Sequence, residues 1–317
     1  MEVCEKKWMI RVDMKSISII LVNYNGKKYN DKCIESILKS TIASQLQIVI
    51  VDNASTDGSL KLLQDNWGKN SQITIISLDK NYGFSEANNV GIRWAEKNGY
   101  DYFLILNNDT EIAKDAVEKM LDAYQKTGAM IVPKIVYADQ PDTIWYAGGQ
   151  FSKIIWKPLP RGMNQKDIGQ YDCSRQCSFA NGCSIFMSKK IIQQLGLLDE
   201  KFFLYYEDTE YSLRARESQV AVWYCAEATV FHKVNGATMG NDRPDSAYYI
   251  ARNWLICNRK WMNKGRFTLF LCYFIPNRIT WMIIWLISGR VNNIISTIEG
   301  IRDYIKGISG QYPKNSL

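Results

Sequence analysis

Acidic residues that could do chemistry lie at three separate points of the chain. Asp52 ends an apolar run, and Asp109 follows two asparagines. Glu207 and Asp208 come directly after the aromatic stretch FFLYY. A positioned carboxylate can remove a proton from a hydroxyl group, and carboxylate oxygens are ligands for Mg²⁺ and Mn²⁺. These residues therefore indicate acid–base or cation-assisted chemistry.

The elements that would position these acids alternate between strand-like and helix-like runs. Short β-branched apolar runs, typical of strands buried on both faces, occupy 17–23, 47–52, 73–77 and 102–107. Helix-like stretches occupy 29–40, 59–67, 85–98 and 114–127. This alternation predicts an α/β fold with a parallel sheet and right-handed crossovers. Further along, we expect strands at 131–137 and 220–231, and a helix from Asp208 to about Glu217.

Polar, turn-forming residues follow each of the four early strands. They occupy 23–26, 52–58, 81–83 and 107–110. Turn chemistry alone explains any one of these loops. Ligands of parallel α/β sheets, however, bind beyond the carboxyl ends of the strands. Four such loops at one edge therefore predict a binding site there.

The composition fits a folded protein with a basic tail. The chain has 317 residues, of which 46% are hydrophobic and 22% charged, which excludes wholesale disorder. This length fits one large α/β domain with a C-terminal extension, or two small domains. From Arg252 onward there are ten Lys and Arg but two Asp and Glu, so the net charge of +7 belongs to the tail. We expect no nucleic-acid partner.

The cysteines and the N-terminus favour a cytoplasmic protein. Residues 1–15 are charged and contain no apolar signal-like segment. The eight cysteines form no regular framework, which is typical of free thiols in a reducing compartment. Cys173, Cys177 and Cys183 are the closest cluster. Their spacing does not fit a zinc ribbon or finger, and the single histidine, His232, is distant in sequence.

A series of motifs carries a family resemblance. They are VNYNG (22–26), VDNASTDGS (51–59), NYGFSEANNVGI (81–92), LNNDT (106–110), FANGCSIFMSKK (179–190), FFLYYEDTEYSLRAR (202–216) and HKVNGAT (232–238). In this order they resemble family 2 glycosyltransferases, in particular the bacterial rhamnosyltransferase-like subgroup. The resemblance covers roughly residues 16–255. It implies a GT-A fold, in which a Rossmann-like, mostly parallel sheet is flanked by helices. We expect a 1–15 extension, a catalytic domain at 16–240 and a helical C-terminal segment at 241–317.

The resemblance implies that a nucleotide-sugar donor binds at the strand ends. Asp52 would accept a hydrogen bond from the pyrimidine ring, because an ionised carboxylate is an acceptor only. The alternative for Asp52 is an Asx-turn or helix cap. Arg252 would contact a phosphate, or else be a helix-surface arginine. The other expected donor-binding residues are Asn23, Asn25, Asn53, Asn81, Gly83, Asn107 and Asn108.

The resemblance also implies a divalent cation, Mg²⁺ or Mn²⁺. Residues 107–109 stand where the family has a DxD-type motif, but only Asp109 is acidic. A second protein ligand is therefore expected. His232 matches the position of a metal-binding histidine in many GT-A enzymes. The alternative for His232 is a structural hydrogen-bonding role.

Asp208 is the general base that the resemblance implies, with Glu207 as its rival. The family inverts configuration in a single displacement, so no covalent sugar–enzyme intermediate is expected. The diphosphate would leave with its charge neutralised by the cation. Alternatively, both acids are helix N-terminal charges favoured by the helix dipole.

The C-terminal segment has the features of a membrane-associating region. Residues 267–287 are nearly long and apolar enough to span a bilayer, but the central Pro276-Asn277-Arg278 opposes spanning. We therefore expect two short apolar helices lying in the membrane interface. Basic and tryptophan residues would support them: Lys260, Lys264, Arg266 and Arg290, with Trp254, Trp261, Trp281 and Trp285. The alternatives are a buried helical hairpin and a contact in a homodimer.

These features predict an inverting, cation-dependent glycosyltransferase at the cytoplasmic face of the cell membrane. The first choice is rhamnose transfer from dTDP-rhamnose to an oligosaccharide or lipid-linked acceptor in cell-surface polysaccharide synthesis. The alternatives are a UDP-sugar-dependent transferase and a non-catalytic membrane scaffold. A dehydrogenase is disfavoured, because Asn23-Tyr24-Asn25-Gly26 stands where a glycine-rich turn would be needed.

Overall fold

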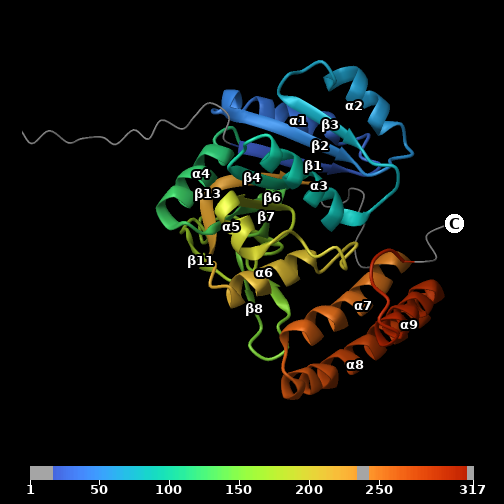
Figure 1. Ribbon diagram of the computed structural model, residues 1–317. Helices are drawn as coiled ribbons and strands as arrows, with labels where there is room; N and C mark the ends of the chain where they lie inside the picture. The colour runs from blue at the N-terminus through green and yellow to red at the C-terminus, as the bar shows by residue number, and fades with distance from the viewer. Residues whose placement is uncertain (1–16, 234–242, 313–317) are drawn as a thin grey trace, which may run out of the picture.

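The structure is a computed structural model that describes residues 17–233 and 243–312. The expected N-terminal extension, the expected boundary at 240 and Gly236 of the HKVNGAT motif lie outside these ranges. The described residues form a layered α/β body with helices α7, α8 and α9 at one end (Figure 1).

An 11-stranded sheet forms the centre of the body. On one side its strands run in the order β4 (Tyr102–Asn107), β1 (Ile17–Asn23), β2 (Leu46–Asp52) and β3 (Ile73–Ser77), all parallel. β1 and β2 are buried along almost their whole length, as expected when helices cover both faces of a sheet. The predicted α/β fold with a parallel sheet is confirmed for this half.

The other half of the sheet is mixed. β12 (Ser184–Ser188) lies antiparallel between β4 and β6 (Met130–Tyr137). β13 (Val222–His232) runs parallel to β6 and antiparallel to β5 (Thr110–Ile112). β7 (Gln140–Tyr146), β10 (Gln165–Lys166) and β11 (Arg175–Cys177) complete this sheet. β8 (Gly149–Phe151) and β9 (Pro158–Pro160) form a separate two-stranded sheet.

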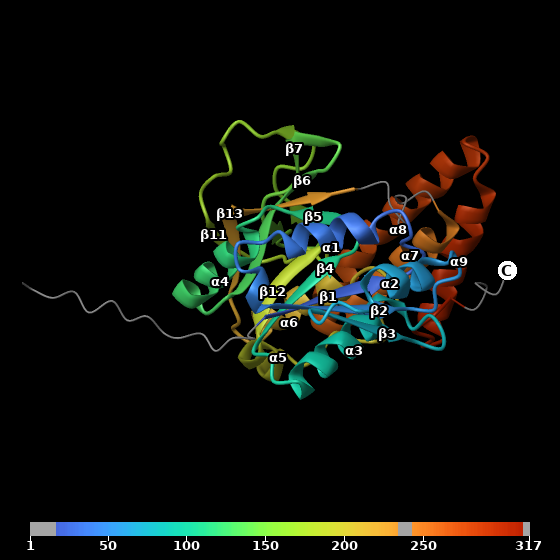
Figure 2. The same ribbon diagram turned by 90° about the horizontal axis from the view of Figure 1, so that it is seen from above.

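Helices cover both faces of the sheet. Figure 2 shows α1 (Asn30–Leu38) and α3 (Gly83–Lys97) on opposite sides of β1. α3 packs against β1 and β2, and α4 (Ala116–Thr127) packs against β13 and β6. The remaining helices of the body are α2 (Ser59–Trp67), α5 (Lys189–Leu195), α6 (Glu207–Glu217) and a 3-10 turn at Ala43–Gln45.

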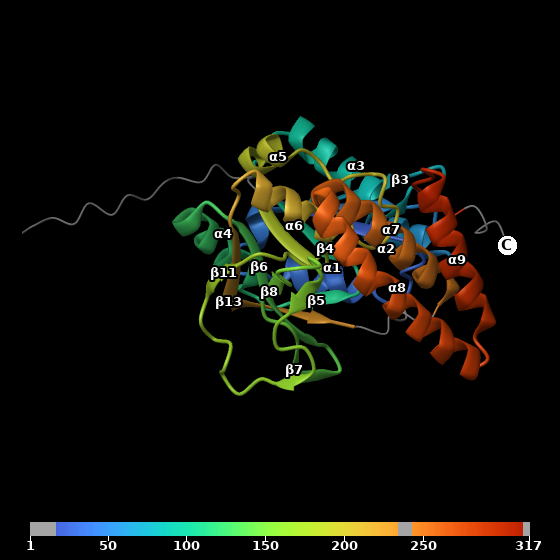
Figure 3. The same cartoon turned by 90° about the horizontal axis from the view of Figure 1, so that it is seen from below.

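Three helices follow the sheet, and the first of them packs against α6 (Figure 3). They are α7 (Pro244–Trp261), α8 (Lys264–Ile287) and α9 (Val291–Ile305). α9 packs against both α7 and α8. Trp254 of α7 joins a buried cluster with Phe202 and Leu213 of the body and Trp156 of the β8–β9 hairpin. The C-terminal helices are therefore attached to the body through a shared apolar core.

The structure corrects two expectations for this segment. α8 is one continuous helix through Pro276 rather than two short helices; the proline removes one backbone donor without ending the helix. Trp254 and Trp285, expected at a membrane interface, are buried. Within the described residues, α8 alone is long and apolar enough to cross a membrane by length and composition.

Candidate active site

Asn23, at the end of β1, is a hydrogen-bonding hub with no exposed surface. Its Nδ2 lies 2.6 Å from Oδ1 of Asp52, 3.1 Å from the Ser55 hydroxyl and 2.9 Å from the Ser59 hydroxyl. Its Oδ1 accepts hydrogen bonds from three more donors: Asn30 Nδ2 (2.9 Å), Asn108 Nδ2 (3.2 Å) and the Gly26 N–H (3.1 Å). One amide thus connects the carboxyl ends of β1, β2 and β4. We call these residues the strand-end hub.

Asp52 belongs to this hub rather than to an open surface. Its side chain has no exposed area. Oδ1 accepts from Asn23, and Oδ2 accepts from the backbone N–H of Ser55 at 3.1 Å. This bond spans three residues, one more than the Asx-turn considered from the sequence. A direct contact between Asp52 and a donor base would require a neighbouring residue to move.

A second set of contacts connects β2 to the start of α3. Asn53 donates to Oδ1 of Asn81 at 2.8 Å and accepts from the Tyr82 N–H at 2.8 Å. Gly83 has a positive φ of 85°, which glycine adopts without steric cost. A Cβ at Gly83 would lie 2.4 Å from the Phe203 carbonyl oxygen. The loop before α3 therefore contacts the segment that precedes α6.

Two tyrosines at this edge are exposed, and sequence reasoning did not single them out. Tyr24 and Tyr82 are 43% and 37% exposed. Tyr24 precedes Asn25, whose backbone has φ 56° and whose Oδ1 accepts from the Thr56 N–H at 2.8 Å. Exposed large apolar groups over a polar rim are suited to stacking on a planar ligand. Their position in turns at the strand ends was the available signal.

Asp109 and His232 lie side by side. β5 pairs with β13 so that Thr110 is opposite His232, and the Lys233 N–H donates to the Asp109 carbonyl at 2.9 Å. His232 Nε2 is 3.2 Å from Asp109 Oδ1, and both side chains are less than a tenth exposed. Neither of these atoms makes a hydrogen bond, and His232 Nδ1 also has no hydrogen-bond partner. Such orphaned buried atoms are rare.

This pair fits a divalent cation. A carboxylate oxygen and an imidazole nitrogen, close together and without hydrogen-bond donors, are a suitable pair of ligands for Mn²⁺. No cluster of three or more His, Cys, Asp or Glu side chains suited to a metal occurs in residues 17–233 and 243–312. Substrate oxygens and water would have to complete the coordination, as is usual for cations bound with phosphates.

The other two residues of the 107–109 turn have different surroundings. Asn108 donates to the side chains of Asn23 and Asn30 and so belongs to the strand-end hub. Asn107 is partly exposed, and its backbone N–H donates to the Cys183 carbonyl at 2.9 Å. Asn107 thereby contacts the turn before β12.

Glu207 and Asp208 begin α6 and lie close to that same turn. Oδ2 of Asp208 accepts from the Gly182 N–H at 3.1 Å, and Oδ1 accepts from the Thr209 N–H at 2.6 Å. A Cβ at Gly182 would lie 3.3 Å from the Asp208 Cβ. Gly182 contacts Asp208, and the next residue in the chain, Cys183, contacts Asn107. This turn therefore brings the acids of α6 to the end of β4. From the sequence, this turn was named only as part of the FANGCSIFMSKK motif.

Burial changes the acidity of both carboxyl groups. Burial raises the pKa of Asp208 above its ordinary value. Burial, and then the neighbouring charge of Asp208, raise the pKa of Glu207 to about 8. Glu207 Oε2 has no hydrogen-bond partner, and its side chain is buried. At neutral pH, therefore, Glu207 holds a proton, so the pair carries at most one negative charge. Perturbed acids of this kind are typical of functional sites.

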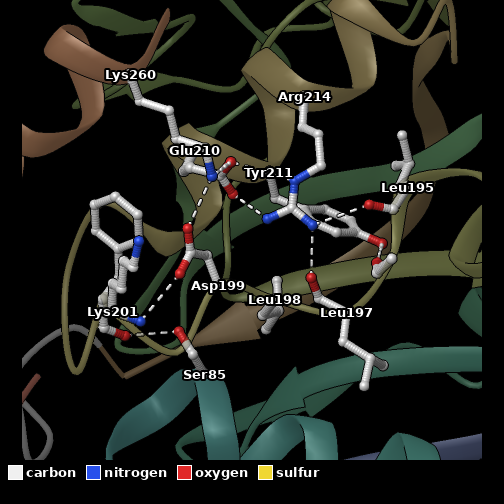
Figure 4. A network of polar contacts seen from close by, with 12 residues as sticks. Ser85, Leu195, Leu197, Leu198, Asp199, Lys201, Glu210, Tyr211, Arg214 and Lys260 are labelled. Carbon is white, nitrogen blue, oxygen red and sulfur yellow. Dashed lines mark hydrogen bonds and ion pairs between the residues drawn. The ribbon is translucent and has the colours of Figure 1, made fainter.

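A buried ionic network holds the rest of α6 (Figure 4). Glu210, which has no exposed side-chain surface, accepts from Lys260 of α7 at 2.8 Å and pairs with Arg214. Lys260 also contacts Asp199 at 2.8 Å. Lys260 therefore links α7 to α6, although its side chain is 40% exposed. Removing one partner of such a network leaves an uncompensated buried charge.

Arg252 does not contact the strand-end hub, which corrects the expected phosphate contact. Its side chain has no exposed surface. Its guanidinium donates to the Tyr248 hydroxyl at 3.0 Å and to the Gly310 carbonyl at 2.7 Å. These internal acceptors satisfy the guanidinium within the C-terminal helices, so it is not available to a phosphate.

Apart from Asn25 and Arg252, the expected site residues thus fall into three groups. Asn23, Asp52 and Asn108 form the hub, whereas Asn53, Asn81 and Gly83 form the adjoining α3 turn. Asp109 with His232 and Glu207 with Asp208 lie near the end of β4, together with Asn107, and Asn25 stands at the rim.

Known protein families and proteins have sequences similar to this chain. Residues 18–196 match the family described as "Glycosyl transferase family 2". The chain is 24% identical to the dTDP-rhamnosyl transferase RfbF of Shigella flexneri over 93% of this chain and 97% of that protein. It is 28% identical to the low-salt glycan biosynthesis hexosyltransferase Agl10 of Haloferax volcanii, over 69% and 67% of the two chains.

A solved structure shows the same fold. GalNAc-T7, crystallised with UDP, GalNAc and Mn²⁺, superposes with a TM-score of 0.57 at 17% identity. The match covers 69% of this chain but only 43% of that longer chain. With the family match, it confirms the predicted GT-A architecture, a mostly parallel sheet flanked by helices, here followed by C-terminal helices.

Proposed function

Because the chain belongs to glycosyl transferase family 2, we propose that it transfers a sugar, with inversion, from a nucleotide-sugar donor to a saccharide acceptor in cell-surface glycan synthesis. The glycosyltransferase activity follows from the family. One observation carries the proposed mechanism: the Asp109–His232 pair and the raised-pKa acid Asp208 both lie near the end of β4.

The proposed donor is dTDP-rhamnose. The likeness to RfbF along nearly the whole chain supports it. The UDP in the GalNAc-T7 structure supports the second candidate, a UDP-sugar. In either case we expect the pyrimidine ring to stack on Tyr24, which is exposed beside the strand-end hub. A hydrogen bond from the ring to Asp52 stays a prediction.

The cation ligands in this proposal are Asp109 and His232. Their buried atoms, 3.2 Å apart and without a hydrogen bond, are the supporting observation. When bound, Mg²⁺ or Mn²⁺ would offset the charge that develops on the diphosphate as it leaves. The hub residue Asn108 neighbours Asp109 in the chain and fixes the turn that carries it.

Asp208 is the proposed general base. Its ionised carboxylate takes the proton of the acceptor hydroxyl while the hydroxyl oxygen bonds to the anomeric carbon of the sugar. The bond between that carbon and the diphosphate oxygen breaks in the same displacement, so the configuration inverts. The raised pKa of Asp208 supports this role, because a carboxylate with a higher pKa is a stronger base. Neutral Glu207, its neighbour, adds no second negative charge at neutral pH.

A membrane surface is the proposed location, at the cytoplasmic face, with a lipid-linked acceptor. Supporting it, α8 and α9 carry apolar side chains that are roughly half exposed: Leu269, Ile275, Ile279, Ile283, Leu286, Val291, Ile295 and Ile298. Arg278, which seemed to oppose contact with lipid, is buried against Trp254 and Phe274. Contiguous exposed apolar surfaces of this kind mark interaction sites. A homodimer contact is the alternative.

Thermal unfolding with a panel of nucleoside diphosphates tests the donor site. We expect dTDP or UDP to raise the melting temperature only with Mn²⁺ or Mg²⁺, because a ligand bound to the native state alone stabilises it. The Asp109→Ala and His232→Ala variants should lose this cation-dependent shift. Absence of any nucleotide-dependent shift in folded wild type would favour the alternative, a non-catalytic scaffold.

Vesicle sedimentation tests the location. Vesicles that contain anionic lipid should retain the wild type, whereas a paired Ile279→Glu and Ile283→Glu variant should stay in solution. Light scattering of the same two proteins without lipid separates the alternatives. A wild-type dimer that the paired variant disrupts, without vesicle binding, would assign this surface to a homodimer.

A further inference from the structure

The segment before α6, residues 202–206, has each of its carbonyl groups held by a specific donor. On the donor-site side, the Ser85 hydroxyl donates to Phe202 O and the Phe84 N–H donates to Phe203 O, both at 2.7 Å. On the other side, one amide of α7, Asn253 Nδ2, donates to the carbonyls of Leu204 and Tyr205, both at 2.9 Å. The segment thus bridges α3 and α7.

The backbone of this segment is strained immediately before the proposed base. Tyr205 and Tyr206 have φ values of 65° and 73°. Non-glycine residues rarely adopt this left-handed conformation, which costs roughly 1 kcal/mol or more per residue. Two successive tyrosines in it require their surroundings to hold them there. The next two residues are Glu207 and Asp208.

The holding contacts come from α7. Besides the two bonds from Asn253, the Tyr205 hydroxyl lies 3.0 Å from the Ser246 hydroxyl. The Phe203 ring stacks on Tyr249, with ring centroids 5.5 Å apart. Asn253 is fully buried, and its Oδ1 accepts from Arg252 Nε at 3.0 Å, which fixes the orientation of the amide. Arg252, itself internal, therefore orients the residue that holds the turn.

We propose that Asn253 is a positioning residue for the transfer reaction. By holding the left-handed Tyr205–Tyr206 turn, it sets Asp208 against the Gly182 N–H and so beside the end of β4. The C-terminal helices are then part of the catalytic apparatus as well as a candidate membrane surface. This inference rests on the proposed role of Asp208 as the base.

The chain supplies a matched control on the same helix. Asn258 is also a fully buried asparagine of α7, and its Nδ2 donates at 3.2 Å to the carbonyl of Ile155 in the β8–β9 hairpin. Its amide makes no hydrogen bond with residues 202–206, so Asn258→Ala removes a comparable buried amide without releasing the turn. Any general loosening of α7 should appear in both variants.

Steady-state sugar transfer by Asn253→Ala, Asn258→Ala and wild type tests the proposal. We expect kcat of Asn253→Ala to fall about 100-fold, the scale expected when a catalytic group is displaced by about 1 Å. The donor KM should stay close to wild type, because the strand-end hub is untouched. Asn258→Ala should keep a near wild-type kcat, even if both variants melt at a lower temperature.

A second substitution separates positioning from stability. Tyr205→Gly in the Asn253→Ala background should restore part of kcat, because glycine adopts the left-handed conformation at no steric cost. Equal losses of kcat in Asn253→Ala and Asn258→Ala, or a raised donor KM at unchanged kcat, would overturn the proposal. If Asn253→Ala does not fold, Ser246→Ala provides the test: kcat should fall at constant KM, and an unchanged kcat counts against the inference.

Asp208→Asn distinguishes the inference from the function on which it rests. An inactive Asp208→Asn variant, with Asn253→Ala behaving like Asn258→Ala, would overturn the positioning role alone. An Asp208→Asn variant with wild-type kcat would overturn the proposed base and the positioning role together. Nucleotide binding, measured by thermal shift in the same samples, reports separately on the donor site.

Discussion

The strand-end hub lies next to the end of β4, where the acidic residues of the site gather. The two regions differ in whether their buried polar atoms have hydrogen-bond partners. At the hub, both atoms of the Asn23 amide have several hydrogen-bond partners, and both oxygens of Asp52 accept. Near β4, Asp109 Oδ1, both His232 nitrogens and Glu207 Oε2 lack hydrogen bonds despite burial. The two regions therefore contain similar types of polar residue, but those of the hub are hydrogen-bonded and several of those near β4 are not.

This difference distinguishes residues that stabilise the fold from residues that take part in the reaction. A buried polar group without a partner costs free energy, so a fold retains it where a ligand or a proton will use it. A satisfied group contributes to stability and geometry instead. Changes at the hub should therefore act mainly on folding, and changes at the acids mainly on turnover.

The largest expected effect is on turnover in Asp208→Asn. Loss of the general base should lower kcat by about 10²- to 10⁴-fold. The melting temperature should change much less, because the amide keeps an acceptor for the Gly182 N–H and loses only the one for the Thr209 N–H. Steady-state transfer assays and thermal melts on the same preparation measure both. Glu217→Gln, at the exposed far end of the same helix, is the control. An Asp208→Asn variant with wild-type kcat would contradict this comparison between the two regions.

Asn23→Ala should have the opposite profile. It removes the shared partner of Asp52, Asn30 and Asn108, and leaving buried groups unsatisfied costs about 1–3 kcal/mol. Chemical denaturation should show this loss in the free energy of unfolding, while kcat per folded molecule changes less than in Asp208→Asn. Asn98→Ala, at an exposed helix end, serves as control. An unfolding free energy equal to wild type would contradict the role of the hub.

Tyr24→Ala sharpens the comparison at the exposed rim of the hub. Removing a stacking ring should weaken nucleotide binding by about 1–3 kcal/mol, as for aromatic platforms under bases. Stability should hardly change, because the ring is largely exposed. Calorimetric titration with dTDP and UDP measures the affinity. Tyr24→Phe keeps the ring and should bind like wild type; an equal loss in both variants would argue against stacking.

Glu207→Gln should remove a pH dependence of stability. The folded-state pKa of Glu207 is raised from about 4.5 to about 8, so the folded chain binds this proton more tightly than the unfolded chain. The resulting contribution to stability is present below pH 4.5 and is lost as the pH rises towards 8. As the pH rises from 5 to 9, the melting temperature of the wild type should therefore fall relative to that of the Glu207→Gln variant. Parallel curves for the two proteins would show that Glu207 titrates normally.

Local sequence pattern was enough to predict the parallel half of the fold. Ile17–Asn23 and Tyr102–Asn107 are strands with the predicted bounds, and Ser59–Trp67 is the predicted helix. Buried parallel strands are continuously apolar and so are visible in one sequence. The rim of polar strand ends followed from them, because parallel strands end at one edge.

The parts that could not be predicted depend on contacts between distant residues. The antiparallel position of β12 and the pairing of β5 with β13, which brings Asp109 to His232, are long-range register. The surroundings of Arg252 include the Gly310 carbonyl, far along the chain. Likewise, local sequence rules predict that the helix breaks at Pro276, yet α8 continues through this residue. The family resemblance predicted that His232 is a metal ligand, whereas the local sequence pattern alone did not decide between this role and a structural one.

The exposed tyrosines at the rim also bear on how donor preference could change over evolution or by engineering. Tyr24 and Tyr82 contribute little to the core, while the backbone that presents them is fixed by Asn23 and Asn53. Substitutions at these tyrosines can therefore be sampled at low cost to folding. A library randomised at Tyr24 and Tyr82 should yield mostly folded protein, whereas one randomised at Asn23 and Asn53 should yield mostly misfolded chains.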